Sequence, residues 1–158
     1  MADIFSRKKR SEIMASILGK ETNPEIIVRK FLFSQGLRFR KNVKDLPGTP
    51  DVVLPKYNTV IFIHGCFWHK HKNCKKAQLP ETRKDFWEKK INGNVRRDKK
   101  NIRQLKEAGW NIIVLWQCNL GKKQSEKWQN SLIEKLITPL QQRSGIPDRG
   151  RKSRHGFV

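Results

Sequence analysis

The chain has 158 residues, of which 36% are hydrophobic and 31% are charged, so its size allows one domain with a modest core. Its 35 Lys and Arg outweigh 14 Asp and Glu to give a formal net charge of +21, which favours a nucleic-acid partner without distinguishing an enzyme from an architectural protein. The sequence shows neither a signal-peptide pattern nor an apolar stretch long enough to span a bilayer, so neither export nor membrane insertion is indicated and we expect a soluble intracellular protein.

The first 36 residues predict two helices. A basic cluster followed by apolar residues at helical spacing indicates a short helix within residues 6–19. Thr22 is a suitable cap residue and Pro24 suits the first turn, so a second helix is expected to begin there and to end near Gly36. The N-terminal part is therefore expected to be helical behind a basic arm.

Three strands are expected next, because alternating or apolar segments are separated by residues typical of turns. Short turns connect neighbouring strands of an antiparallel meander. We therefore predict a three-stranded meander made of residues 37–43, 51–54 and 59–63.

The second half of the chain predicts a loop, a long helix and another strand. Residues 65–81 show no periodicity and are expected to form a loop. Thr82, with Asp85 three residues later, predicts a capped helix that continues to Gly109. The apolar segment 110–116 follows this crossover helix, so it is expected to pair in parallel with an earlier strand.

A final amphipathic helix is expected over residues 122–140, followed by a basic segment with five Arg or Lys against one Asp. This last segment is predicted to be disordered when it is not bound. The expected organisation is an N-terminal basic arm and helix, a central domain and a basic tail, which correspond to residues 1–20, 21–140 and 141–158.

Three cysteines and a histidine form the clearest metal-binding pattern. Cys66, His71 and Cys74 lie in the predicted loop, and Cys118 follows the strand that ends at residue 116. An odd number of cysteines argues against a disulfide framework, whereas a Cys3His set is a common tetrahedral zinc site. The alternative is a set of free thiols beside a solvated histidine.

Several residues suggest phosphodiester hydrolysis. Asp51 begins one predicted strand and His64 ends the next, so their side chains are expected to approach each other. Hard oxygen ligands bind Mg²⁺, and a neutral imidazole takes a proton near pH 7. His69 is a second imidazole, and Glu25 is a further carboxylate whose alternative role is a favourable interaction with the dipole of its own helix. Alone, Asp51 and His64 also fit ordinary turn and surface positions.

Phe67 and Trp68 are adjacent aromatic residues in a polar loop. They either fill a local core or stack against nucleic-acid bases. The surrounding sequence favours base stacking, because residues 70–106 contain 14 Lys or Arg and four acids.

Taken together, these motifs resemble the very short patch repair (Vsr) DNA mismatch endonucleases, a branch of the PD-(D/E)xK nucleases. The segment His-Gly-Cys-Phe-Trp-His at residues 64–69 is highly specific, and the resemblance extends over residues 8–120. The matching positions are Arg10, Ser11, Met14, Pro24, Glu25, Phe86, Trp87 and residues 46–51, 60–69, 71–74, 94–98 and 109–118.

The resemblance implies an α/β fold of the restriction-endonuclease type, with a mixed central sheet flanked by helices and a structural zinc site. It implies an enzyme that nicks one strand beside the thymine of a T·G mismatch left by deamination of 5-methylcytosine. In this family pattern Asp51 and the main-chain carbonyl of Ile63 bind Mg²⁺, His64 and His69 act at the scissile phosphate, and Asp98 orients a catalytic histidine. His69 is the preferred general base.

The same resemblance assigns Zn²⁺ to Cys66, His71, Cys74 and Cys118. It assigns insertion beside the mismatch to Phe67 and Trp68, with Met14 wedging from the opposite groove. The implied partner is double-stranded DNA with a T·G mismatch, and mismatch-repair proteins are further candidate partners. We expect a monomer in the cytoplasm that associates with the bacterial nucleoid when bound to DNA.

The sequence departs from the general nuclease pattern at two places. Residues 62–64 replace the usual acid-x-Lys, so phosphate and water are expected to complete the Mg²⁺ shell. Gln117 stands where Glu is frequent, which puts a charged role there in doubt. Two alternative functions remain open: a non-catalytic, zinc-stabilised mismatch-binding protein, and a nuclease of the same fold with another DNA substrate.

Overall fold

A computed structural model describes residues 6–16, 21–121 and 125–144. The chain divides into two compact units, residues 1–38 and residues 39–158. In the described ranges, no helix is both long enough and apolar enough to cross a bilayer. The predicted basic tail lies outside these ranges from residue 145 onwards.

The first unit contains two helices, α1 (Arg7–Ser16) and α2 (Asn23–Ser34). Pro24 occupies the first turn of α2 as expected, and the chain leaves the helix through Gly36, whose φ of +71° suits a residue without a Cβ. Thr22 does not cap the helix with its side chain. Its hydroxyl instead donates a hydrogen bond of 2.9 Å to the Glu25 carboxylate, so Thr22 stands at the predicted cap position without a side-chain bond to the main chain of the helix.

The second unit is built on a mixed sheet in the order β1-β2-β3-β4. The first three strands are antiparallel neighbours and β4 pairs in parallel with β3, so the predicted meander and the predicted parallel pairing are both confirmed. Only the first strand differs clearly from expectation, because it is two residues long. The strands are β1 (Arg40–Lys41), β2 (Val52–Leu54), β3 (Thr59–His64) and β4 (Asn111–Trp116).

The long helix α3 (Lys84–Glu107) connects β3 to β4, after the 65–81 segment and its short 3-10 turn η2 (Lys75–Ala77). The predicted cap at Thr82 is wrong: Arg83 precedes the first helical residue, has a φ of +54°, and no side chain caps the helix there. The predicted end is correct, because Gly109 turns the chain with a φ of +86°.

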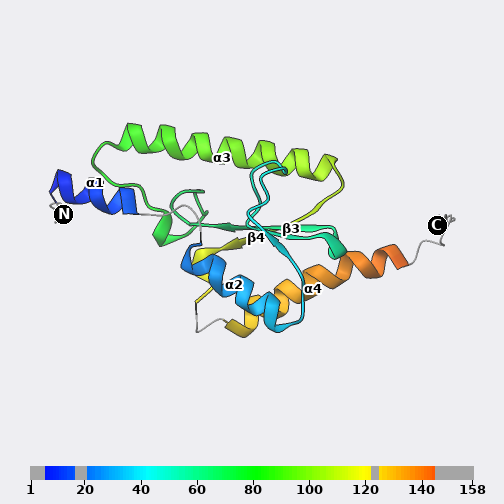
Figure 1. Cartoon of the computed structure of the whole chain (residues 1–158). Helices are drawn as coiled ribbons and strands as arrows, with labels where there is room; N and C mark the ends of the chain where they lie inside the picture. Colours follow the sequence, from blue (N-terminus) through cyan, green and yellow to red (C-terminus); the bar gives the residue numbers. More distant parts are fainter. Residues whose placement is uncertain (1–5, 17–20, 122–124, 145–158) are drawn as a thin grey trace, which may run out of the picture. The chain divides into compact units, whose positions relative to one another are not determined.

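The last helix, α4 (Ser125–Ser144), follows a short 3-10 turn, η3 (Gln117–Asn119), and continues past Pro139 beyond the predicted end. Figure 1 shows α3 and α4 on opposite faces of the sheet. Helix α4 contacts β4 and the 3-10 turn η1 (Pro55–Tyr57), whereas α3 contacts β4 from the other face. The sheet is therefore covered on both sides, as the nearly continuous apolar sequence of β3 requires.

The core beneath α3 explains why this helix holds its place. Leu105 is fully buried in a cluster with residues of β2 and β3 and of the loop between β1 and β2. Partly buried residues of α3 and β4 pack around this cluster. Apolar burial of this kind is the main stabilising contribution in a domain of this size. The buried members are Val43, Val53, Val60, Phe62 and Leu105.

Replacing Leu105 by Ala should destabilise the second unit by about 2–5 kcal/mol, because it removes a fully buried side chain and leaves a cavity. The measurement is urea unfolding followed by circular dichroism. Lys106→Ala, at the next and exposed position of α3, is the matched control and should stay within about 0.5 kcal/mol of the wild type. Equal stability of the two variants would contradict this description of the core.

Candidate active site and metal centre

The parallel pairing of β3 with β4 brings two reactive segments to one edge of the sheet. The register places His64 directly opposite Trp116 at the last pair of the ladder. Cys66 and Cys118 each follow two residues after these positions. Because both strands end at the same edge, the segments that follow them lie side by side.

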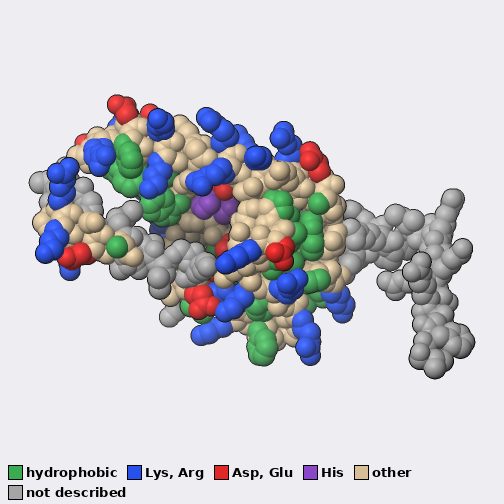
Figure 2. Space-filling model, turned by 45° about the horizontal axis from the view of Figure 1, so that its top comes forward, with side chains coloured by type: hydrophobic (Ala, Val, Ile, Leu, Met, Phe, Trp, Pro, Cys, Tyr) green, Lys and Arg blue, Asp and Glu red, His purple; other side chains and the backbone are tan. Residues whose placement is uncertain are grey.

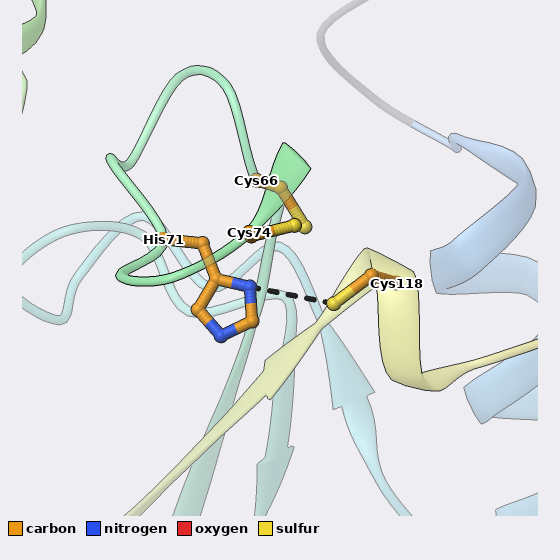
Figure 3. A group of neighbouring side chains, drawn as sticks. All are labelled: Cys66, His71, Cys74 and Cys118. Carbon is orange, nitrogen blue, oxygen red and sulfur yellow. Dashed lines mark hydrogen bonds between the residues drawn. The ribbon is translucent and has the colours of Figure 1, made fainter. Parts of the chain in front are cut away.

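Four candidate metal ligands meet at this edge. The sulfur atoms of the three cysteines and a ring nitrogen of His71 all lie within 4.8 Å of one another. The Nδ1 atom of His71 is 3.3 Å from the Sγ atom of Cys118, and Figure 3 shows all four side chains pointing toward a common centre. The structure thus brings together the whole set that the sequence suggested: Cys66, His71, Cys74 and Cys118.

These donors fit a tetrahedral metal ion. Metal–sulfur bonds of about 2.3 Å place tetrahedral donors roughly 3.5–4 Å apart, and these four donors, all within 4.8 Å of one another, are close enough to share one ion. Burial and the neighbouring Cys66 thiol raise the pKa of Cys118 to about 11. The pKa of Cys74 shifts the other way, because hydrogen bonds from the Lys76 main chain and from the other two thiols outweigh the effect of desolvation. Three sulfur donors and one imidazole nitrogen at one place are the donor set of a closed tetrahedral metal site.

A second cluster consists of His64, His69 and Asp98. The two imidazole rings are stacked, with centroids 3.8 Å apart and an angle of 5° between their planes. The Nδ1 atom of His69 lies 2.6 Å from the Oδ2 atom of Asp98, which comes from α3. A carboxylate accepts hydrogen bonds, so His69 donates through Nδ1, and in the neutral imidazole the lone pair then lies on Nε2.

His64 is buried, with 7% of its surface exposed. Burial and, to a lesser extent, the neighbouring His69 lower the pKa of His64 to about 4, although Asp98 acts in the opposite direction. His64 is therefore neutral near pH 7. Two stacked imidazoles can remain this close because they do not both carry a positive charge.

Asp51 lies immediately before β2 and is held against the neighbouring strand. Its Oδ2 atom accepts a hydrogen bond of 2.7 Å from the main-chain N–H of Ile63, one residue before His64. This contact directs the carboxylate toward the end of β3 where the two histidines lie. The sequence expectation that Asp51 and His64 come from adjacent strands is confirmed by the pairing of β2 with β3.

Trp116 connects the two clusters. Its ring stacks on His71 with centroids 4.1 Å apart and an angle of 7°, and it meets His64 edge-on at 5.3 Å. A continuous series of rings thus runs from His71 through Trp116 and His64 to His69. Sequence reasoning missed this residue, although its position at the end of the predicted parallel strand was the available signal.

Phe67 and Trp68 form part of a larger aromatic cluster. Both rings are half-buried and contact Trp87 of α3, at centroid distances of 5.4 Å and 6.1 Å. Lys90 lies 5.6 Å from the Trp68 ring centroid, and Asn94 donates a hydrogen bond of 3.1 Å to the Trp68 carbonyl. The sequence analysis named Trp87 only as a position that matches the family and did not place it in this cluster.

The surface around these residues is strongly basic. Figure 2 shows histidine side chains on one face of the molecule and Lys and Arg side chains gathered over α3. A cationic surface beside half-buried aromatic rings suits a ligand with anionic groups and flat bases.

Glu25 and Met14 belong to the first unit. Glu25 is buried, accepts hydrogen bonds from the Thr22 hydroxyl and the Glu21 main-chain N–H, and lies 3.5 Å from the Arg29 guanidinium. These contacts satisfy the carboxylate within its own unit. The side chain of Met14 lies outside the described part of the chain, so its wedging role stays a prediction, as does a catalytic role for Glu25.

Comparison with known proteins decides the family. The family profile described as DNA mismatch endonuclease Vsr matches residues 2–76. The type II nicking enzyme V.NmeAIP of Neisseria meningitidis is 53% identical over 123 residues, which cover 78% of this chain and 87% of that protein. The chain belongs to the Vsr family. The DNA mismatch endonuclease Vsr of Escherichia coli is 43% identical over 120 residues, or 76% of each chain.

Membership of the Vsr family confirms the resemblance inferred from the sequence and makes the protein a DNA endonuclease. A second relative, the type II nicking enzyme V.XorIIP of Xanthomonas oryzae pv. oryzae, is 47% identical over 77% of this chain and 88% of its own. The Vsr-family endonuclease presented here carries its two clusters of candidate ligands and its aromatic cluster in one unit of the fold.

Cys118→Ala should remove the bound metal, because it deletes the only donor supplied from beyond β4 and leaves three ligands in one loop. We expect about one metal ion per chain in the wild type and close to none in the variant, measured by elemental analysis after gel filtration. Lys76→Ala changes an exposed residue of the same loop and should keep the metal. A Cys118→Ala protein with full metal content would contradict the assignment.

Trp116→Leu should loosen both His71 and His64, because it removes the ring that lies between them. By NMR, the imidazole signals of His71 and His64 should shift or broaden. The DNA-nicking rate should fall about 10–100-fold, as for other residues that position ligands. Trp110→Leu, just before the start of β4, is the control, since Trp110 packs against the core and should alter stability without moving these signals. Unchanged imidazole signals in Trp116→Leu would show that Trp116 does not hold His71 and His64 in position.

Proposed function

We propose that this protein is a Mg²⁺-dependent mismatch endonuclease with a restriction-endonuclease-like fold, which nicks one strand beside the thymine of a T·G mismatch. Such mismatches arise when 5-methylcytosine is deaminated, and the nick would initiate very short patch repair. The observation that carries the proposal is the His69–Asp98 contact beside the buried His64 and the aromatic cluster. Family membership and the basic surface support it.

His69 is the proposed general base. Its Nδ1–H is held by Asp98, so Nε2 can take a proton from the attacking water. The water oxygen then bonds to phosphorus while one P–O ester bond breaks. Asp98 stabilises the imidazolium that forms and fixes the ring orientation, which makes it a positioning residue.

His64 has a different proposed role, because it is neutral and largely buried. It can donate a hydrogen bond to a phosphate oxygen as negative charge develops there. The stacked arrangement with His69 keeps the two imidazoles parallel, so both rings present an edge in the same direction.

Asp51 and the carbonyl of Ile63 are the proposed protein ligands of Mg²⁺. The Asp51 carboxylate is fixed beside this residue by its bond to the Ile63 N–H, and carboxylate and carbonyl oxygens are ligands that Mg²⁺ prefers. When bound, the ion supplies charge stabilisation at the phosphate. Few side-chain ligands are available here, which suits an ion that retains several waters and binds substrate phosphate.

Zn²⁺ is the proposed ion of the Cys3His cluster, because thiolate and imidazole donors in a closed tetrahedron favour it. All four protein donors would be used, so the role is structural. The ion would fix the loop that carries Phe67, Trp68 and His69 to the end of β4.

Mismatch recognition is assigned to Phe67 and Trp68, with Met14 acting from the opposite groove. Partly unstacked bases can stack on half-buried rings, and a T·G pair costs less to open than a matched pair. We further propose that the protein acts as a monomer on nucleoid DNA and that mismatch-repair proteins are candidate partners.

The test is a nicking assay with Mg²⁺ on a duplex that carries one T·G pair, beside the matched duplex. The wild type should cut only one strand, next to the thymine. Asp98→Asn should lower the rate about 10²–10⁴-fold with little change in DNA affinity, because an amide favours the wrong imidazole tautomer. Asp51→Ala should abolish cutting while binding persists.

Asp45→Asn provides the control, since it makes the same chemical change as Asp98→Asn at an exposed position of the same unit. It should retain the wild-type rate. Equal cutting of the matched duplex would instead favour a nuclease with another DNA substrate, and tight binding without any cut would favour a mismatch-binding protein.

A further inference from the structure

A groove of about 780 Å³ lies beside the metal cluster, outside the residues assigned to the reaction. One wall is the loop of residues 70–78 and the other is the middle of α3. His71 and Cys74 belong both to this wall and to the metal cluster, so a bound ion would hold the loop wall in a fixed shape.

The lining of the groove is cationic. Four lysines contribute to it, together with the amide side chains of asparagine and glutamine residues, and no carboxylate is among the described lining residues. Lys70 donates a hydrogen bond of 3.1 Å to the Asn92 amide oxygen. The other three ammonium groups are exposed and form no ion pair among the residues that the structure describes: Lys72, Lys75 and Lys99.

The groove uses a different face of α3 from the active site. Asn92, Val95 and Lys99 are spaced by three and four residues and therefore share one side of the helix. Asn94 and Asp98 share another side, where they contact Trp68 and His69. The loop that carries the catalytic histidine thus has the reaction site on one side and the cationic groove on the other.

We propose that this groove binds the sugar-phosphate backbone of the DNA duplex away from the nicked bond. The inference rests on the proposed function, in that the ligand is the same duplex. Lysine ammonium groups bind phosphates as point charges, and duplex DNA presents one negative charge per about 1.7 Å of its axis, so several phosphates fall within reach of one groove. Lys and Arg side chains gather over α3 (Figure 2), the helix that forms one wall of the groove, and this wider basic surface favours DNA over an acidic protein.

The groove should contribute affinity without sequence or mismatch preference. Phosphate contacts fix the register of a protein on the duplex but carry no base information. Each neutralised phosphate adds about 0.9 to the magnitude of the slope of log Kobs against log salt. Removing groove lysines should therefore weaken binding to T·G and matched duplexes equally.

The experiment compares two triple variants that lose the same charge. Lys72→Gln/Lys75→Gln/Lys99→Gln changes the groove, whereas Lys56→Gln/Lys127→Gln/Lys135→Gln changes exposed lysines on η1 and α4. DNA affinity is measured from about 50 to 300 mM salt, a range over which phosphate contacts dominate the change. In the groove variant, the magnitude of the slope of log Kobs against log salt should fall by about 2–3, at roughly 0.9 per lost phosphate contact. In the control variant it should fall by less than about 0.5.

Lys99→Gln alone, on α3 and away from the metal ligands, protects the test against misfolding of the loop and should reduce the slope by about 0.9. Nicking at saturating DNA should stay at the wild-type rate in all three variants. Slopes equal to that of the wild type in both groove variants would overturn the proposal. It would also be overturned if the groove variants bound DNA as the wild type does but no longer bound poly-glutamate, since the groove would then bind an acidic protein rather than DNA. Failure of the wild type to nick a T·G duplex would instead refute the proposed function, which the salt slopes do not measure.

Discussion

The parallel pairing of β3 with β4 is the constraint on which both clusters depend. Six consecutive residue pairs fix the register and place His64 opposite Trp116. A shift by one residue would turn alternate side chains to the other face of the sheet and separate these two rings. The segments that carry Cys66 and Cys118 would then diverge, because each is tied to its strand by only two residues. Strand register therefore determines whether a metal cluster can form at all.

The rings at the ends of these strands link the Cys3His set to His64 and His69. Trp116 contacts His71 on one side and His64 on the other, and His64 stacks on His69. Large rings in contact restrict each other's rotation, because a core packed to this density leaves few alternative rotamers. A metal ion at the cluster would thus limit the motion of residues that are not its ligands.

The sequence predicted local features better than contacts between distant elements. The apolar run of β3, the turns before it and the crossover helix were sufficient to predict the meander and the parallel pairing. The Cys3His set was also recognisable, since three of its donors lie in one predicted loop and the fourth follows a predicted strand. Helix caps were less reliable: Thr22 stands at the predicted cap position, but α3 begins after Arg83 rather than from a Thr82 cap. Capping depends on where the preceding chain points, which sequence spacing does not specify.

Contacts made across the fold were harder to predict, and they include the most informative ones. Resemblance suggested that Asp98 orients a histidine, but the 2.6 Å contact with His69 depends on the rotation of α3 relative to the loop. The same rotation brings Trp87 to Phe67 and leaves Lys99 in the cationic groove. Asp98 is one of four acids in a segment with 14 Lys and Arg, yet its short contact is with a histidine. On so basic a helix, an acid that contacts an imidazole rather than a lysine or arginine constrains the position of that imidazole, while the surrounding cations create a positive field that attracts polyanions.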